Sequence, residues 1–160
     1  MVAIMPIAQF ELTKGMSDED AAALTALASP VHVASGATLF SLGSEADHLY
    51  VVERGRIALT LPMTVHGREQ DVFVEERLPG QAFGWSALIP PHQFTLKATA
   101  PLDTHVLAFP RDALLQYFAG RPALGYLVTR NVALVIGQRL QVFQAMWLRE
   151  MQRAVALRLA

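Results

Sequence analysis

The sequence contains no cysteine. This absence excludes disulfide bonds, thiolate nucleophiles and zinc sites built on thiolates, and it is typical of proteins in a reducing cytosol. A dominant sign of charge is missing as well, because 13 Lys and Arg residues stand against 14 Asp and Glu residues and give a formal net charge of −1. The chain as a whole therefore has no electrostatic attraction to nucleic acid or to an anionic membrane.

Long apolar segments are also scarce. The uncharged stretch at residues 78–96 contains glycine, proline, glutamine and histidine, which do not suit a membrane-spanning helix. The first ten residues lack the basic region and the long apolar run of a secretion signal. We therefore expect a cytoplasmic protein without a membrane partner.

The chain does contain many hydrophobic residues that can form a core. Its 160 residues are 52% hydrophobic and 17% charged, so the apolar share is above, and the charged share below, what is usual for a globular domain. The length corresponds to one domain. Part of the apolar excess is expected to be buried against a partner.

Short alternating segments follow one another between turns that contain glycine. This spacing predicts strands at residues 31–34, 38–40, 49–52, 57–61, 70–76 and 94–99. No segment between them is long enough for a crossover helix, so the strands should pair in antiparallel fashion. We predict a mainly β fold, an antiparallel β-roll of the jelly-roll or double-stranded β-helix type.

Helices are expected on both sides of the roll. Ser17 is a typical N-cap, and the acidic residues after it predict a short N-terminal helix at residues 17–28. A short helix at residues 110–119 and a long C-terminal helix at residues 122–158 follow the roll. The expected units are the β-roll with its N-terminal helix, residues 1–120, and the long helix, residues 121–160.

The segment at residues 80–100, which we call the cassette, has the composition of a ligand-binding loop. Gly84 can adopt a positive φ and lets the backbone approach another group closely. We expect the amides of Ser86 and Ala87 to open a short helix and to point toward an anion. The sequence therefore predicts an oxyanion-binding turn here.

The cassette resembles the phosphate-binding cassette of the cyclic-nucleotide-binding domains, in the family of the catabolite activator protein and FNR. The family pattern is roughly F-G-E-[LI]-A-L, a turn, and then R-[ST]-A. Phe83-Gly84, Ala87-Leu88 and Thr95 match this pattern. The hairpin spacing upstream is also similar to that of the family, at Gly36, Leu39, Gly43, Leu49, Tyr50, Val52 and Gly55. The resemblance covers most of the chain and implies a regulatory β-roll domain whose closing strand is at residues 100–109.

Two positions that hold the nucleotide in the family differ here. Trp85 stands where the family has the glutamate that accepts the ribose 2′-hydroxyl, and Phe94 stands where it has the arginine that pairs with the cyclic phosphate. Leu96 replaces the alanine of the pattern. The resemblance therefore implies a domain that does not bind cyclic AMP or cyclic GMP in the usual way. Lys97 is either a replacement cation or a solvent-facing lysine.

The expected ligand pocket combines the cassette with the long helix. Its residues are Phe83, Gly84, Trp85, Ser86, Ala87, Phe94, Thr95, Leu96 and Phe143. Four interpretations stay open for it: a pocket filled by its own side chains, a site for an apolar small molecule, an altered cyclic nucleotide site, and a haem site like those of some relatives. His92 or a methionine would be the haem ligand.

The long helix carries an apolar stripe. The stripe includes Val132, Ile136, Leu140, Phe143 and Trp147. In the family this helix forms the dimer interface and closes over the ligand, and Arg139-Leu140 resembles the usual Arg-Leu pair of the family. We expect a homodimer through this helix and a regulatory protein as partner.

The arginines of the long helix point in different directions, so they form no basic stripe for nucleic acid. We expect them, Arg139 included, to lie in solvent or against a partner, and we expect Asn131 on the polar face. No helix-turn-helix follows Ala160, so we expect no DNA-binding domain and no direct DNA binding.

Residues for catalysis or metal binding form no recognisable pattern. The five histidines occur without H-x-H or H-x₃-H spacing, and no serine lies in a nucleophile elbow. His48 faintly resembles the first ligand of a metal-binding cupin, but Tyr50 stands where the second histidine would be. We expect no enzyme activity, no catalytic residues and no metal, with a cupin-like metalloenzyme as the weaker alternative.

Overall fold

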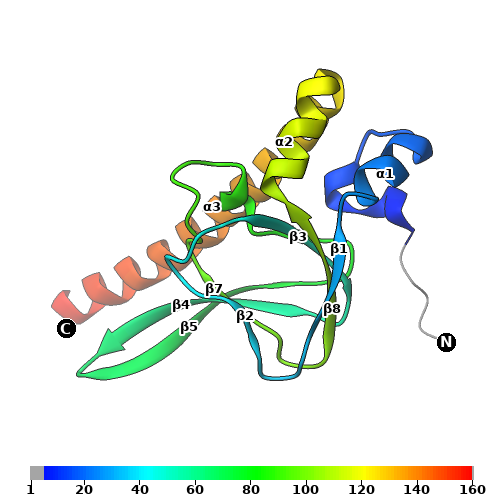
Figure 1. Cartoon of the computed structure of the whole chain (residues 1–160). Helices are drawn as coiled ribbons and strands as arrows, with labels where there is room; N and C mark the ends of the chain where they lie inside the picture. The colour runs from blue at the N-terminus through cyan, green and yellow to red at the C-terminus, as the bar shows by residue number, and fades with distance from the viewer. Residues whose placement is uncertain (1–5, 160) are drawn as a thin grey trace.

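The fold is a β-roll built from two antiparallel sheets (Figure 1). The computed structural model describes residues 6–159. Within this range the sheets have the strand orders β1-β8-β3-β6 and β2-β7-β4-β5, which confirms the predicted fold class. The strands are β1 (Ser29–Val33), β2 (Thr38–Phe40), β3 (His48–Arg54), β4 (Ile57–Val65), β5 (Arg68–Arg77), β6 (Ala82–Phe83), β7 (Lys97–Thr99) and β8 (Thr104–Pro110).

Helices precede and follow the roll (Figure 1). Those that precede it are η1 (Ile7–Gln9), η2 (Glu11–Thr13) and α1 (Asp18–Thr25), and those that follow it are α2 (Arg111–Gly120) and α3 (Pro122–Leu159). A further short helix, η3 (Trp85–Ala87), lies within the roll between β6 and β7. Ser17 caps α1 as predicted, since its hydroxyl accepts the Asp20 N–H at 3.1 Å. The helix ends at Thr25 rather than at residue 28, because the Ala28 N–H donates to the Thr25 carbonyl in a tighter turn. No helix in the described residues is both long enough and apolar enough to cross a membrane.

Several strand boundaries differ from the sequence prediction, and β8 begins at Thr104 rather than at residue 100. Residues 94–96 lie outside any strand, because the Phe94 N–H donates to the Ser44 carbonyl at 3.0 Å and the Phe94 carbonyl accepts the Gly43 N–H at 2.8 Å. Strand β7 is correspondingly short. Strand β6 was not predicted, since two residues are too few for an alternating pattern to be recognised.

The core lies between the two sheets and continues beneath α3, where Val132 and Val135 are buried. Asn131 is not on a polar face, as expected from the sequence, but is buried. Its side-chain amide donates to the carbonyl oxygens of Leu12, at 2.9 Å, and Lys14, at 3.0 Å. This amide therefore attaches α3 to the N-terminal segment.

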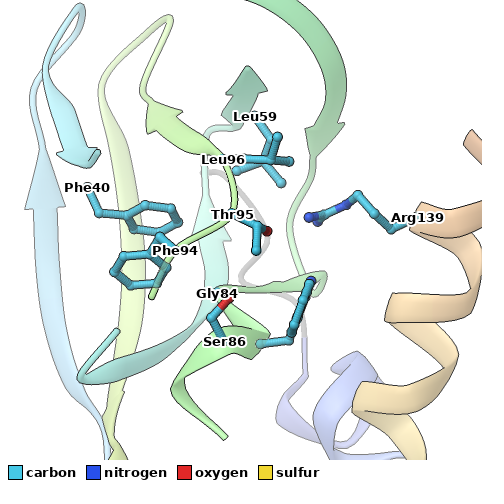
Figure 2. Close-up of a pocket in the computed structure, with 9 residues that line it drawn as sticks. Phe40, Leu59, Gly84, Ser86, Phe94, Thr95, Leu96 and Arg139 are labelled. Atoms are coloured by element: carbon cyan, nitrogen blue, oxygen red, sulfur yellow. The ribbon is translucent and has the colours of Figure 1, made fainter. Parts of the chain in front are cut away.

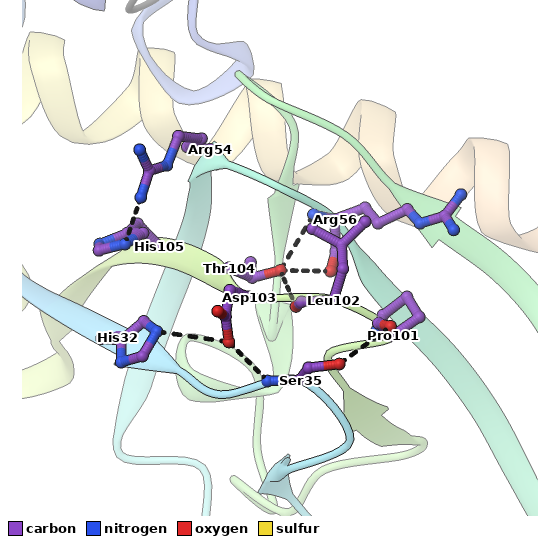
Figure 3. A network of polar contacts seen from close by, with 9 residues as sticks. All are labelled: His32, Ser35, Arg54, Arg56, Pro101, Leu102, Asp103, Thr104 and His105. Carbon is purple, nitrogen blue, oxygen red and sulfur yellow. Dashed lines mark hydrogen bonds and ion pairs between the residues drawn. The ribbon is translucent and has the colours of Figure 1, made fainter. Parts of the chain in front are cut away.

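The turn between β3 and β4 is held by Thr104 at the start of β8 (Figure 3). The Thr104 hydroxyl accepts the Arg56 N–H at 3.1 Å and lies 2.9 Å and 2.8 Å from the carbonyl oxygens of Arg56 and Leu102. Gly55 in this turn has a φ of +88°, which favours glycine. A Cβ on Gly55 would lie 2.8 Å from the Asp103 carbonyl oxygen, so the turn has no room for a side chain.

Gly55→Ala is expected to lower the free energy of unfolding by about 2–3 kcal/mol, through left-handed strain and overpacking. The matched control is Gly36→Ala, at a glycine with a φ of +81° whose added Cβ would meet nothing within 4 Å. This control is expected to lose only about 1 kcal/mol. Urea denaturation gives both values, and equal losses would show that contact with β8 does not constrain the turn.

Candidate functional site

The cassette makes a tight turn after β6. Gly84 has a φ of +76° and is the N-cap residue of η3. An added Cβ would lie 3.0 Å from the Tyr50 ring and 3.3 Å from the His48 carbonyl oxygen, so glycine is required here, as the sequence predicted. The expectation for the Ala87 amide is wrong, because this N–H donates to the Gly84 carbonyl at 3.1 Å instead of pointing to a ligand.

Aromatic rings fill the space beside this turn. Phe94 and Phe40 stack with their centroids 3.6 Å apart and their planes 7° from parallel (Figure 2). Tyr50 stacks on Phe83 at 5.2 Å and on Phe40 at 5.8 Å, and all four side chains are buried. The position at which the resemblance places a phosphate-binding arginine is therefore part of the hydrophobic core.

A small cavity remains between the cassette and α3. Its volume is about 10 Å³, roughly the room for the centre of one water molecule. Thr95 at its edge is exposed, so the cavity reaches the surface there. The lining residues are Phe40, Leu59, Gly84, Trp85, Ser86, Phe94, Thr95, Leu96 and Arg139.

Most of the predicted pocket residues meet at this cavity, and three do not. The six that line it are Gly84, Trp85, Ser86, Phe94, Thr95 and Leu96. Phe83 and Ala87 are fully buried in the core. Phe143 is partly buried and packs against the same core. Whether any of these side chains binds a ligand stays a prediction.

Arg139 is the lining residue that sequence reasoning placed elsewhere. It was expected in solvent or against a partner, but it is 6% exposed and extends from α3 toward Thr95 (Figure 2). Its Nε donates to a carboxylate oxygen of Glu75 on β5. Burial lowers the pKa of Arg139, and the negative charge of Glu75 opposes that shift. The cavity therefore contains a cation, which the Arg139-Leu140 resemblance could have indicated.

Glu75 and Arg139 belong to a chain of four charges that we call the buried ion-pair network, with Glu11 and Arg77 as its other members. Arg77 Nη1 lies 3.8 Å from a Glu75 carboxylate oxygen, and Arg77 Nη2 lies 2.6 Å from Glu11 Oε2. The same Glu11 oxygen accepts the Ala82 N–H of β6 at 2.8 Å. The network thus connects η2, the start of the cassette, β5 and α3.

Other cations and possible metal ligands lie apart from the cavity. Lys97 is not a replacement for the missing arginine, because its Nζ pairs with Asp71 at 2.7 Å. His92, the suggested haem ligand, has its Nδ1 3.2 Å from the Ser86 carbonyl oxygen. Among residues 6–159, no group of three or more histidine and carboxylate side chains could hold a metal ion.

A second, apolar cavity of about 140 Å³ lies on another side of the cassette. It is lined by residues of the cassette, α2 and α3 and is open to solvent on one side, where Ile89 and Leu115 are exposed. Its lining residues are Leu88, Ile89, Leu115, Phe118, Thr129, Val132, Ala133 and Ile136. Two of these, Val132 and Ile136, belong to the stripe that the sequence assigned to dimerisation.

Tyr50 is expected to make the fold sensitive to alkali. Burial, and then the negative charge of Asp47, raises the pKa of Tyr50 from 10.0 to about 12. The unfolded chain therefore releases this proton at lower pH than the folded protein, so the stability is present below about pH 10 and is lost as the pH rises toward 12. We expect the free energy of unfolding to fall by roughly 2–3 kcal/mol over this interval.

The measurement is urea denaturation of the wild type and of Tyr50→Phe, which has no group to ionise, between about pH 9 and 12. The two curves should diverge as the pH rises, with the variant losing less stability. Parallel curves would contradict the shifted pKa of Tyr50.

Comparison with known proteins identifies the family. The model of the cyclic nucleotide-binding domain matches residues 30–121, more than half of the chain. The chain belongs to the cyclic nucleotide-binding domain family. A relative in Mycobacterium tuberculosis, the CRP-like cAMP-activated global transcriptional regulator, is 28% identical over 127 residues, which are 79% of this chain and 55% of the relative. The chain thus spans about half the length of this curated relative.

Solved structures of the family have the same fold. The N-terminal domain of a transcriptional regulator from Streptomyces coelicolor aligns with a TM-score of 0.69 and 28% identity, over 82% of this chain and 93% of that one. The catabolite activator protein of Thermus thermophilus aligns with a TM-score of 0.72 and 25% identity, over 89% of this chain and 63% of that one. The fold and the family inferred from the cassette are thereby confirmed.

Proposed function

We propose that this cyclic nucleotide-binding domain is a regulatory sensor, without enzyme activity, that has lost the usual binding of cyclic AMP and cyclic GMP. The observation that carries the proposal is the cavity of about 10 Å³ beside the stacked rings of Phe40 and Phe94. A ribose phosphate with a purine base needs far more space than one water molecule. A nucleotide would have to displace these rings from the core.

The missing ligands support the same proposal. By the resemblance of the cassette, Trp85 and Phe94 stand at the positions of the glutamate and the arginine that hold ribose and phosphate in the family. Loss of a charge-assisted arginine contact to a phosphate typically costs about 2–5 kcal/mol. Arg139 comes from α3 rather than from the position of the family arginine, and its Nε already donates to Glu75.

The α3 helix is proposed to form a homodimer and to transmit the state of the site to a regulatory protein partner in the cytoplasm. Leu140 and Trp147 of the predicted stripe are 58% and 66% exposed, whereas Ile136 and Phe143 pack partly against the roll. The exposed apolar row continues through Leu148, Met151 and Val155. A second copy of α3 would remove this row from water. Light scattering that gives twice the mass of one chain would support the dimer.

Calorimetric titration with cyclic AMP and cyclic GMP tests the sensor proposal. The wild type is expected to give no saturable heat at micromolar concentrations. The double variant Trp85→Glu/Phe94→Arg restores both family ligands and is expected to bind cyclic AMP at least tenfold more tightly than the wild type. Its control is Phe94→Arg combined with Trp85→Gln, which lacks the carboxylate. Micromolar binding of either nucleotide by the wild type would overturn the proposal.

A second candidate function is the sensing of a small apolar molecule, and the cavity of about 140 Å³ favours it. An apolar cavity of about 150 Å³ holds benzene in another protein. A ligand there would contact the cassette, α2 and α3 together, and so could alter the position of α3. A rise in the thermal unfolding midpoint with benzene or indole in the wild type, but not in Ala133→Phe, would support this candidate.

A further inference from the structure

Two histidines meet on the outer face of the roll, one on the edge strand β1 and one on its neighbour β8. His32 and His105 are directly opposite each other in the register of these strands. Their ring centroids are 4.9 Å apart, and the ring planes are tilted by 35° (Figure 3). His32 is exposed and His105 is partly exposed, so both imidazoles are accessible from solvent. Neither histidine lines the two cavities described above.

We infer that this histidine pair is a binding site for a divalent transition-metal ion, with Cu²⁺ bound more tightly than Ni²⁺ or Zn²⁺. Neutral imidazole is a good ligand for all three ions, and Cu²⁺ generally has the highest affinity for nitrogen ligands. Imidazole nitrogens bind such ions at about 2.0–2.1 Å. Because the nitrogens lie at the edges of the rings, two rings at this centroid distance can reach one ion after small side-chain rotations.

Two charged residues contact the pair (Figure 3). Arg54 Nη2 on β3 lies 2.8 Å from His105 Nε2. Since a guanidinium group can only donate, this nitrogen carries a lone pair, which is the form of imidazole that binds metal. Asp103 Oδ1 lies 3.7 Å from His32 Nε2 and places a negative charge beside the site. Arg54 therefore competes with a metal ion for His105, whereas Asp103 attracts the ion.

The two imidazoles are the whole ligand set that residues 6–159 offer, since no group of three histidine and carboxylate side chains among them could hold a metal ion. Water would fill the remaining coordination positions. A site with two protein ligands binds more weakly than a structural zinc site, which has four. We therefore expect this site to exchange its ion with the medium and to respond to the concentration of free metal.

A bound ion would join β1 to β8 through their side chains. Strand β1 is at the edge of its sheet, where β8 is its neighbour, so its backbone is paired on one side only. An ion held by both histidines binds the folded protein and not the separated strands. A ligand with this preference stabilises the folded state increasingly as its concentration exceeds the dissociation constant. The metal is therefore expected to raise the thermal unfolding midpoint.

The experiment titrates the full chain, without a histidine tag and freed of metal by a chelator, with the chlorides of Cu²⁺, Ni²⁺ and Zn²⁺. The buffer is at about pH 7.5, because imidazole binds metal only when it is deprotonated. Isothermal calorimetry is expected to give one ion per chain, and the thermal unfolding midpoint should rise with each ion. The electron paramagnetic resonance spectrum of the Cu²⁺ complex should show coupling to two nitrogens.

Variants of the site give opposite signs. His32→Gln and His105→Gln should each weaken Cu²⁺ binding at least about tenfold, because even a residue that only orients a metal ligand typically changes affinity by about 10–100-fold. Asp103→Asn should bind a few-fold more weakly. Arg54→Gln removes the competing guanidinium and should bind a few-fold more tightly, a gain that loss of stability cannot imitate. The control His66→Asn, at an exposed histidine, should match the wild type.

The inference is overturned if the wild type binds none of the three ions with a defined stoichiometry, or if His66→Asn loses as much affinity as His32→Gln. Loss of binding in only one of His32→Gln and His105→Gln would assign the ion to a single histidine and would also overturn it. None of these results depends on nucleotide binding, so the proposed function is tested separately.

Discussion

Replacing Arg77 by alanine is expected to lower the free energy of unfolding by about 3–5 kcal/mol. Arg77 is 4% exposed. Its guanidinium lies 2.6 Å from the carboxylate of Glu11 and 3.8 Å from that of Glu75. The variant therefore keeps two largely buried carboxylates but only one cation, Arg139, which contacts Glu75 alone. Urea or guanidinium denaturation followed by circular dichroism measures the loss.

The control for this change is Arg149→Ala, which removes an exposed arginine and should alter stability by no more than about 0.5 kcal/mol. Adding Glu11→Gln to Arg77→Ala should recover part of the loss, because one of the unpaired carboxylates is then neutral. A loss below about 1 kcal/mol for Arg77→Ala would show that water screens the network as it screens a surface ion pair.

Phe94→Ala is expected to destabilise the fold by about 3–5 kcal/mol, the usual range for deleting a buried ring. Phe94 is buried, and its ring stacks on Phe40 at a centroid distance of 3.6 Å. Removing it leaves one face of Phe40 without contacts at the wall of the small cavity. The matched control is Phe73→Ala, since the Phe73 side chain on β5 is 58% exposed.

Phe73→Ala should lose less than about 1 kcal/mol, and similar losses for the two variants would contradict the role given to the stacked rings.

Phe94→Ala also distinguishes the effect of the cavity volume on ligand binding from the effect of the missing arginine charge. It enlarges the cavity without supplying an arginine, so we expect it to remain without measurable binding of cyclic AMP. Binding by this variant would show that the ring alone, and not the missing cation, excludes the nucleotide.

The roll could be predicted from the sequence because its determinants are local. Gly55 and Gly84 adopt the positive φ values that their turns require, and the strands between turns supply many of the apolar residues of the core. The six lining residues that the sequence identified come from one continuous segment, residues 84–96. The sequence motif of the cassette also indicated the family, which the periodicity of apolar residues alone does not indicate.

The polar half of the site could not be predicted because it joins residues far apart in the chain. Glu75 and Arg139 are separated by 64 positions, and Asn131 reaches back over 119 positions to Leu12. A pattern of apolar and polar residues on a helix assigns arginine and asparagine to the outside. Here each is buried and has a hydrogen-bond partner outside α3, and the periodicity of α3 contains no information about that partner.

The family match begins at residue 30 and ends at residue 121, and Glu11 and Arg139 lie outside it on opposite sides. A fragment cut at these limits would retain Arg77 and Glu75 but would lack the outer counterion of each. It would also lose the carboxylate that ties the Ala82 amide in place. We therefore expect the autonomous folding unit of this protein to be longer than residues 30–121. A fragment with these limits would lack two of the four charges of the buried ion-pair network.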